Sequence, residues 1–226
     1  MIITIDGPAG TGKSSVSQEV ARRLGYSFLD TGAMYRAIAL AAIGRGVALD
    51  DLAALGELAG QVSVDFDWSG DPPCVRLDGQ DVADLIRSEE ASSGASKVAV
   101  APQVRAAMVQ LQQKVGIARP NLVTEGRDQG TIVFPDAGLK VYLTANAEER
   151  ASRRMLQLEA QGQQVEYAPL LAQIRERDAR DTGRAVGPLA IPAGAEVIDT
   201  TALTQEQVTA KIVELAHARA AAADLV

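Results

Sequence analysis

The sequence predicts an α/β fold in which a parallel five-stranded sheet is covered by helices on both faces. Short segments rich in apolar and β-branched residues alternate with amphipathic segments of helical period, which is typical of parallel sheets with crossover helices. A glycine-rich octet, GPAGTGKS, joins the first expected strand to the first expected helix. The chain has 226 residues, 47% hydrophobic and 23% charged, and is long enough to bury a sizeable core.

The expected strands are short and rich in β-branched or aromatic residues. They cover residues 2–6, 27–30, 122–125, 139–144 and 197–199. Helices are expected over residues 13–23, 31–44 and 102–116, then as one long arginine-rich helix from Ala147 and a final helix from Gln205. In a parallel sheet of this kind, ligands bind at the carboxyl ends of the strands.

One stretch departs from this alternation. Residues 61–90 contain two short alternating runs, VSVDFDW and CVRLDG, joined by the turn-rich SGDPP. These runs predict an antiparallel hairpin and a short helix, inserted between the second helix and the third strand. An ordinary decorated loop is the alternative, but a structureless excursion of about 30 residues is unusual in a compact domain. Trp68 and Cys74 are expected to pack within this insert.

Composition excludes several classes of protein. The net charge of −7 argues against a general nucleic-acid-binding protein, since such proteins carry a basic face. The single cysteine offers neither a disulfide framework nor a cysteine-based metal site, and it fits a reducing compartment. No apolar run approaches the ~18 residues of a membrane-spanning helix, and the N-terminus lacks the basic start of a secretory signal. We therefore expect a cytoplasmic enzyme that binds neither membrane nor nucleic acid.

The octet matches G-x-x-x-x-G-K-[ST] at every fixed position and predicts a P-loop of the NTPase type. Its glycines let backbone N–H groups surround a phosphate, and the helix N-terminus adds positive partial charge. Lys13 is expected to reach the β- and γ-phosphates of a nucleotide, and Ser14 to hold Mg²⁺. The predicted nucleotide site comprises Gly7, Pro8, Ala9, Gly10, Thr11, Gly12, Lys13, Ser14 and Ser15.

An arginine-rich segment indicates a second anion site. Between Asn146 and Arg184 there are seven arginines and no lysine. The planar guanidinium binds phosphate oxygens in pairs and neutralises charge on a moving phosphoryl group. Arg177, Asp181 and Arg184 fall at i, i+4 and i+7 of a helical pattern, which places a carboxylate between two guanidinium groups. A structural ladder of ion pairs is the alternative, although exposed pairs contribute little stability.

Two further segments bring charged residues to the carboxyl ends of expected strands. EGRDQG places Arg127 and Asp128 after the third strand, and LDTGAMYR places Thr31 and Arg36 after the second. An acceptor hydroxyl would need a base, whereas an acceptor phosphate is mostly dianionic at neutral pH and needs none. The acidic candidates are flanked by arginines that keep them ionised. The excess of arginine over plausible bases therefore favours a phosphate acceptor.

Six segments together resemble the bacterial cytidylate (CMP/dCMP) kinases. GPAGTGKSS, LDTGAMYR, ASKVAVAPQVR, EGRDQGTIVFPDA, EERASRRMLQL and RERDARDTGRAVGPL occur in the order and spacing of that family. The resemblance extends from Ile2 to the final expected helix. It implies a single-domain nucleoside monophosphate kinase with a core at 1–60 and 96–226, a monophosphate-binding insert at about 61–95 and a mobile lid at about 150–167.

The resemblance also implies roles for individual residues. It places Arg36, Arg127 and Arg177 on the phosphate of CMP, and Arg177 with Asp181 near the ribose. Around the cytosine it places Thr31, Ser96, Arg105, Asp128 and Arg184. The catalytic charges it implies are those of Lys13, Arg127, Arg177, Arg150 and Arg154. Cytosine has an N4 amino group that donates to a carboxylate such as Asp128, whereas uracil has a carbonyl there that the carboxylate would repel.

The implied activity is transfer of the γ-phosphoryl group of ATP to CMP or dCMP by a monomer that uses Mg²⁺. The chain departs from the family pattern at Thr31, where many relatives have serine, and at Glu125, where aspartate is common. Three alternatives remain at this stage. They are a kinase of the same fold with a hydroxyl acceptor, a monophosphate kinase that prefers UMP or AMP, and a P-loop switch. A switch would ordinarily need an aspartate after an apolar strand, and only Glu125 follows such a strand here.

Overall fold

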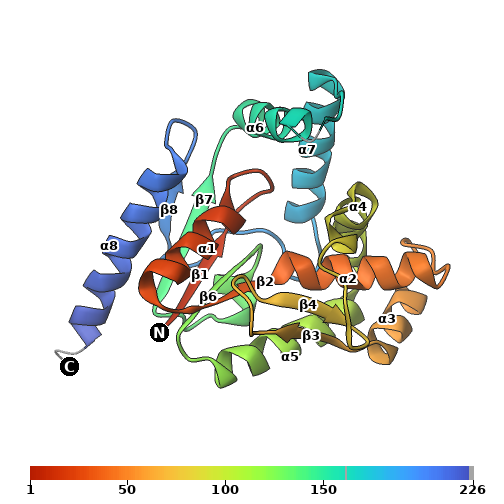
Figure 1. Cartoon of the computed structure of the whole chain (residues 1–226), viewed down its shortest axis with the longest axis horizontal. Helices are drawn as coiled ribbons and strands as arrows, with labels where there is room; N and C mark the ends of the chain where they lie inside the picture. Colours follow the sequence, from red (N-terminus) through yellow and green to blue (C-terminus); the bar gives the residue numbers. More distant parts are fainter. Residues whose placement is uncertain (161, 224–226) are drawn as a thin grey trace. The chain divides into compact units, whose positions relative to one another are not determined.

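The computed structural model describes residues 1–160 and 162–223 and divides into two compact units. Unit 1 comprises Met1–Ser27 and Asn121–Val226, and unit 2 comprises Phe28–Pro120. In the described part of the chain the main sheet has five strands, in the order β2-β6-β1-β7-β8 (Figure 1). Their bounds are Ile2–Asp6 (β1), Ser27–Asp30 (β2), Leu122–Gly126 (β6), Leu139–Thr144 (β7) and Glu196–Asp199 (β8).

The pairing of these strands confirms the predicted fold class, a parallel five-stranded sheet with flanking helices. Strand β1 pairs in parallel with β6 on one side and β7 on the other, and β7 pairs in parallel with β8. All five expected strands form, with bounds that differ from the expected ones by at most one residue. The expected insert hairpin also forms, because β3 and β4 pair antiparallel.

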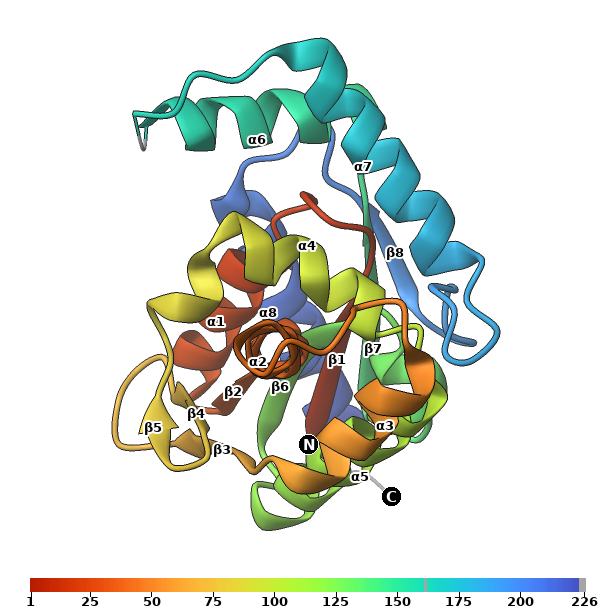
Figure 2. The same cartoon turned by 90° about the vertical axis from the view of Figure 1, so that its right-hand side faces the viewer.

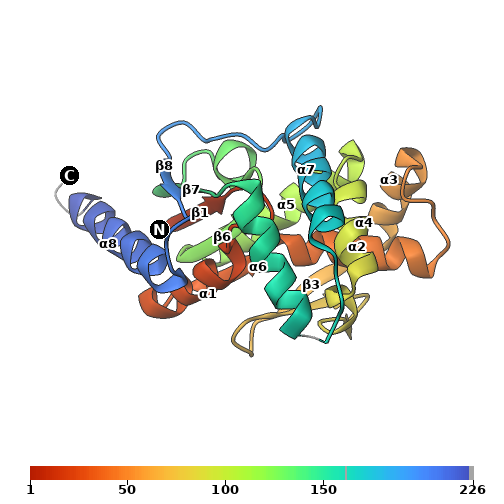
Figure 3. The same ribbon diagram turned by 90° about the horizontal axis from the view of Figure 1, so that it is seen from above.

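The core of unit 1 lies around its central strands. Ile3 and Ile5 of β1 and Val141 and Leu143 of β7 are fully buried, as expected for strands that are covered on both faces. Helix α1 (Lys13–Leu24) packs against β6 and β1, and helix α8 (Gln205–Ala223) packs against α1 and β7. Figures 1 and 3 show α8 beside α1. This packing holds the loop between β1 and α1 above the carboxyl end of β1.

The segment after Ala147 corrects one expectation. Instead of one long arginine-rich helix, the chain forms α6 (Ala147–Ala160) and α7 (Tyr167–Thr182), which pack against each other (Figure 2). Between them Gly162 has φ 77°, a left-handed conformation that interrupts a helix. Ala151, Leu158, Leu170 and Ile174 form the apolar cluster between the two helices. Burial of these side chains favours a helical hairpin over one exposed helix.

The predicted lid at 150–167 overlaps this helical hairpin, and its boundaries stay a prediction. Residue 161 of the predicted lid and residues 224–226 of the predicted core lie outside the described residues. Arg184 also differs in position from its expected place on a helix face, because α7 ends at Thr182 with Gly183 as its C-cap. A π-helical turn, Gln129–Val133 (η2), follows β6 and was not predicted.

Unit 2 contains the remaining elements. They are α2 (Thr31–Gly44), α3 (Leu52–Gln61), β3 (Val64–Asp67), β4 (Cys74–Leu77), β5 (Gln80–Asp81), η1 (Leu85–Arg87), α4 (Glu89–Val98) and α5 (Pro102–Ala118). Side-chain caps explain several helix starts, because Asp30, Asp51 and Ser88 accept hydrogen bonds from the backbone N–H three residues later. Helices α3 and α4 were not predicted, because their glycines and small polar residues weaken the helical pattern.

Candidate functional site

The glycine-rich loop between β1 and α1 has the backbone conformation of a phosphate cradle. Gly7 has φ 149°, and a Cβ at this position would lie 2.1 Å from the carbonyl oxygen of Leu143. Gly12 caps α1 in a left-handed conformation with φ 84° and provides no side-chain cap for the helix. The first N–H groups of α1 and its positive partial charge are therefore available to an anion.

Lys13 lies at the start of α1 with its side chain buried to 5% exposure. Its Nζ donates a hydrogen bond to the carbonyl oxygen of Pro8 at 2.7 Å, and Thr11 Oγ1 donates to the same oxygen at 3.1 Å. Burial, together with the positive charge of Arg127, lowers the pKa of Lys13 to about 7, while Glu125 opposes the change. An incoming phosphate would favour the charged amine.

Ser14 and Glu125 connect two of the sequence motifs. Ser14 Oγ donates a hydrogen bond to Glu125 Oε1 at 2.5 Å, and Glu125 is buried at the end of β6. Its neighbour Arg127 is also close enough to Lys13 to affect the pKa of that amine. The sequence left the role of Glu125 open, and the structure places its carboxylate on the serine that was expected to hold a metal ion.

Asp181 is buried at the centre of a cluster of arginines. Arg127 Nε donates to Asp181 Oδ2 at 2.8 Å, and Arg184 Nη2 lies 3.4 Å from Asp181 Oδ1. Burial alone would raise the pKa of Asp181, but Arg127, together with Arg184 and Arg177, holds it below its usual value. The helical spacing indicated that Arg177 and Arg184 would lie on either side of Asp181. The structure adds Arg127, which comes from a different sequence motif, to the same carboxylate.

Asp6 was missed by the sequence reasoning. It is the last residue of β1 and is fully buried. Its Oδ1 accepts a hydrogen bond from Gln129 N at 2.9 Å, and its Oδ2 accepts one from Gly130 N at 2.8 Å. Burial raises the pKa of Asp6 to about 6, although these two hydrogen bonds oppose the increase. The signal in the sequence was a carboxylate at the end of a strand, directly before the glycine-rich loop.

The arginines of α6 have three different environments. Arg150 is buried and donates to Ala9 O at 3.0 Å and to both carboxylate oxygens of Asp178 at 3.0 and 2.6 Å. Arg153 donates to Thr200 O at 2.6 Å. Arg154 is half-buried and donates to Gln157 Oε1 at 3.0 Å, within its own helix. Arg150 and Arg154 are the two arginines of α6 that were expected to neutralise charge on the transferred phosphoryl group. Arg150 contacts the glycine-rich loop, whereas Arg154 contacts its own helix.

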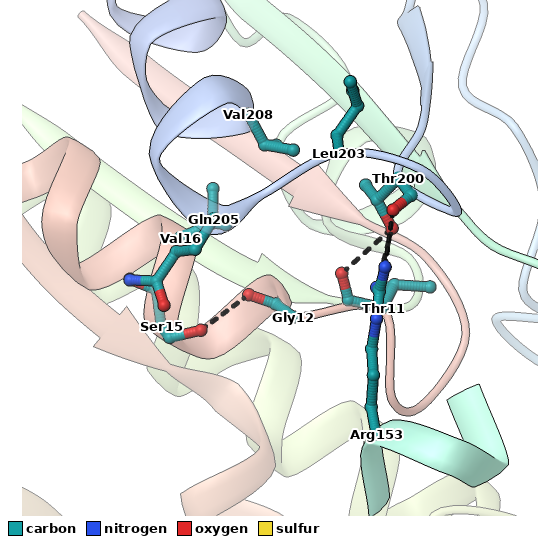
Figure 4. Close-up of a pocket in the computed structure, with 9 residues that line it drawn as sticks. All are labelled: Thr11, Gly12, Ser15, Val16, Arg153, Thr200, Leu203, Gln205 and Val208. Carbon is teal, nitrogen blue, oxygen red and sulfur yellow. Dashed lines mark hydrogen bonds between the residues drawn. The ribbon is translucent and has the colours of Figure 1, made fainter. Parts of the chain in front are cut away.

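A cavity of about 210 Å³ lies beside the glycine-rich loop (Figure 4). Its lining residues are Thr11, Gly12, Ser15, Val16, Arg153, Thr200, Leu203, Gln205 and Val208. Thr200 Oγ1 lies 3.4 Å from Thr11 O and accepts from Arg153 Nη1 at 3.2 Å. The segment between β8 and α8 therefore forms one wall of the cavity and the P-loop forms another, an arrangement that the sequence did not indicate.

Asp128 is buried in unit 1, directly after Arg127. The predicted site residues Thr31, Arg36, Ser96 and Arg105 belong to unit 2 and are described there by themselves. Arg36 Nη2 pairs with Asp30 Oδ2 at 2.7 Å, so the N-cap of α2 also anchors a guanidinium on the same helix. Arg105 of α5 is buried with its guanidinium carbon 5.8 Å from the ring centroid of Tyr35. Thr31 and Ser96 are buried at α2 and α4. Helix α2 packs against both α4 and α5.

The charges in unit 1 define what this arrangement can do. Lys13, the start of α1 and the arginines around Asp181 provide positive charge for phosphate oxygens. The chemistry indicated is phosphate binding and phosphoryl transfer.

Among the residues that the structure describes, no group of three or more His, Cys, Asp and Glu side chains could hold a metal ion. Within the same residues, no helix is both long enough and apolar enough to cross a membrane.

Comparisons with known proteins point to one family. The family model described as cytidylate kinase matches residues 3–218. A curated cytidylate kinase of Stutzerimonas stutzeri is 50% identical over 213 residues, which is 93% of this chain and 93% of the relative. One of a Marinomonas species is 46% identical over 226 residues, 100% of this chain and 97% of the relative. An uncharacterized protein from Eubacterium ventriosum has a similar fold, with a TM-score of 0.53, 12% identity and coverage of 95% of this chain and 97% of that chain.

Proposed function

The chain belongs to the cytidylate kinase family, and from this membership we infer that it phosphorylates CMP and dCMP with ATP. It transfers the γ-phosphoryl group of ATP to the phosphate of CMP or dCMP and releases ADP and CDP or dCDP. The observation that carries this function is the family match over nearly the whole chain, joined to a P-loop with buried Lys13 and a cluster of arginines around the buried Asp181.

The donor site is the P-loop with the cavity beside it. The loop amides and Lys13 bind the phosphates of ATP, because backbone N–H groups and a buried amine favour negative charge. We assign the adenosine part of ATP to the cavity, since it adjoins Thr11 and Gly12 and has aliphatic walls at Val16 and Leu203. Arg153 lies at its edge and is held there by Thr200.

The residues present fit Mg²⁺. Ser14 Oγ and the Glu125 carboxylate are hard oxygen donors in contact at the start of α1, and Mg²⁺ needs few protein ligands because it keeps waters and phosphate oxygens. Ser14 would hold the ion, and Glu125 would bind it or one of its waters. When bound, Mg²⁺ would neutralise negative charge on the phosphates of ATP.

The acceptor phosphate is assigned to Arg127 and Arg177 of unit 1 and to Arg36 of unit 2, as the family pattern implies. An oxygen of the CMP phosphate attacks the γ-phosphorus, and the bond from that phosphorus to the β,γ-bridging oxygen breaks. The bridging oxygen keeps the electron pair and leaves as part of ADP. The attacking phosphate is mostly dianionic at neutral pH, so no side chain has to remove a proton. Arg127 is held for this role by Asp181.

The base is assigned to Asp128 and Arg184 of unit 1 and to Thr31, Ser96 and Arg105 of unit 2, and the ribose to Arg177 with Asp181. Asp128 is buried directly after Arg127, so a base that presents a carbonyl instead of an amino group to its carboxylate would bring two acceptors together where water is excluded. For assembly and location, the prediction stays a monomer in the cytoplasm. Light scattering of the purified protein tests the prediction of a monomer.

The function is tested by ADP production from Mg-ATP with CMP, dCMP, UMP, AMP, shikimate or no acceptor. We expect turnover with CMP and dCMP well above that with every other acceptor. Equal rates with all of them, including no acceptor, would contradict the proposal. An Asp128→Ala variant should lose activity on CMP far more than on UMP, whereas an equal loss on both would show that Asp128 does not read the base.

A further inference from the structure

Asp6 occupies a position that the phosphoryl transfer above does not use. It directly precedes Gly7 of the P-loop, and its two carboxylate oxygens accept hydrogen bonds from two consecutive backbone N–H groups, those of Gln129 and Gly130. These residues follow Asp128, the residue assigned to the base. One side chain at the end of β1 therefore connects the P-loop strand to the segment that carries Arg127 and Asp128.

The same segment is also held from the neighbouring strand. Thr124 Oγ1 of β6 donates to Gln129 Oε1 at 2.9 Å, and β6 pairs directly with β1 (Figure 3). At Gly130 there is no room for a side chain, because a Cβ would lie 2.8 Å from Pro192 Cγ and 2.9 Å from Thr4 Oγ1. The segment after Asp128 is thus held by the backbone N–H groups of Gln129 and Gly130 and by the side chain of Gln129.

Stability does not explain a carboxylate at this place. Asp6 is fully buried, and the increase in its pKa shows that the surrounding protein disfavours its charge. Asp128 adds to this effect and Lys13 opposes it, and Arg127 and Tyr142 also interact with Asp6. In some proteins a buried charge that lowers stability is retained because it specifies one arrangement of the groups around it.

A role as general base is excluded by the geometry. Both oxygens of Asp6 are occupied by backbone N–H groups, and the side chain has no exposed surface from which to reach a substrate. The transfer also needs no base, since the acceptor is a phosphate. What remains is an effect exerted through Gln129 and Gly130.

We propose that Asp6 is a positioning residue that holds the segment from Arg127 to Gly130 in register with the P-loop, and thereby sets both the affinity for CMP and the discrimination against UMP. This inference rests on the proposed function, because it takes Arg127 and Asp128 as the groups that bind the acceptor. Its effect should fall on the acceptor and leave ATP binding unchanged.

The test is Asp6→Asn, which keeps the shape of the side chain but can accept only with one oxygen. We expect kcat/KM for CMP to fall about 10-fold or more, since small displacements of positioning groups have large effects on rate. The ratio of kcat/KM for CMP to that for UMP should fall with it, while KM for ATP stays within about twofold. Asp136→Asn is the matched control, because Asp136 is an exposed carboxylate that follows the same π-helical turn.

A second measurement separates positioning from general loss of structure. Amide hydrogen exchange in a peptide that covers residues 127–133 should rise in Asp6→Asn, with exchange in the β7 strand unchanged. If Asp6→Asn does not fold, Asp6→Ser is measured in the same way, because its hydroxyl is too short to reach both N–H groups. An unchanged ratio of CMP to UMP use in a folded variant overturns the inference, as does an equal loss in ATP binding. Failure of the wild-type protein to prefer CMP would instead overturn the proposed function.

Discussion

Ser14 Oγ donates a hydrogen bond to Glu125 Oε1 at 2.5 Å, although the two residues are 111 positions apart in the chain. The contact forms because β1 and β6 are neighbours in the sheet, so the P-loop after β1 and the carboxyl end of β6 meet at the same edge. Because the Ser14 hydroxyl donates its hydrogen to Glu125, its lone pairs can face a cation such as Mg²⁺. The Glu125 carboxylate is in place to bind the same ion.

Glu125→Gln is expected to raise the Mg²⁺ concentration needed for half-maximal activity. The amide keeps the size of the side chain but lacks the negative charge, and loss of a group that orients a metal ligand costs about 10–100-fold in metal affinity or activity. Initial rates measured against Mg²⁺ at fixed ATP and CMP check this. Glu57→Gln, on the exposed face of α3, is the control. An unchanged Mg²⁺ dependence in Glu125→Gln would show that the carboxylate serves only to pack the sheet edge.

ATP binding is expected to take up a proton near pH 8. Because the pKa of Lys13 is lowered to about 7, the amine is mostly neutral at that pH in the free protein, and phosphate oxygens raise its pKa and restore the charge. Calorimetric titrations in buffers of different ionisation enthalpy measure this uptake. It should vanish in Lys13→Ala, whose turnover should fall by about 10²-fold or more with the fold intact. Equal proton uptake by Lys13→Ala would assign it to another group.

Asp181→Asn is expected to weaken both stability and acceptor binding. Removal of one partner from a buried ion pair costs about 3–5 kcal/mol, because the charges of the buried Arg184 and the largely buried Arg127 lose their partner. The pKa of Asp181 is held below its unfolded value of 3.8, so its contribution is present above pH 4 and is lost as the pH falls further. Urea unfolding at pH 7 and at acid pH should show a difference between wild type and variant only at the higher pH. A variant with wild-type stability at pH 7 would contradict this account.

Arg150 and Asp178 are expected to act as one unit that attaches α6 and α7 to the P-loop. Arg150→Lys loses the bidentate contact with Asp178 and the bond to Ala9 O, so unfolding free energy should fall by about 1.5–3 kcal/mol and KM for ATP should rise. A double variant with Asp178→Asn should lose little beyond the worse single variant. Additive losses would show that the two side chains act separately. Arg219→Lys, at an exposed pair with Glu196, is the control.

The sequence was most informative where local pattern and long-range structure agree. Strands β1 and β7 have the expected bounds, because β1 is a short run rich in isoleucine and β7 alternates buried apolar residues with less buried ones, and both patterns are typical of sheet strands. The P-loop was readable because its glycines are needed at left-handed and close-packed positions, as at Gly7 and Gly12. These requirements act within a few residues of one another, and so they appear directly in the amino-acid order.

Predictions from the local sequence pattern were wrong or incomplete where a contact between distant segments decides the structure. The arginine-rich stretch reads as a single helix, yet the apolar cluster that contains Leu158 of α6 and Ile174 of α7 favours a hairpin. The role of Glu125 was open in the sequence because its partner Ser14 belongs to another motif. For Asp6 the only signal in the sequence was its place between a strand and the glycine-rich loop, and a carboxylate there has the same appearance whether it is exposed or buried.

The amino-acid order by itself therefore determined the fold class, the P-loop and, through its resemblance to a family, the reaction. Tertiary structure alone decided which charges are buried and which partner each one has, as at Asp181 with Arg127 and at Asp6 with Gln129. The physical reason is that burial and pairing depend on which strands become neighbours. A carboxylate in water and one enclosed by protein differ in pKa and in the cost of losing a partner, and sequence spacing measures neither.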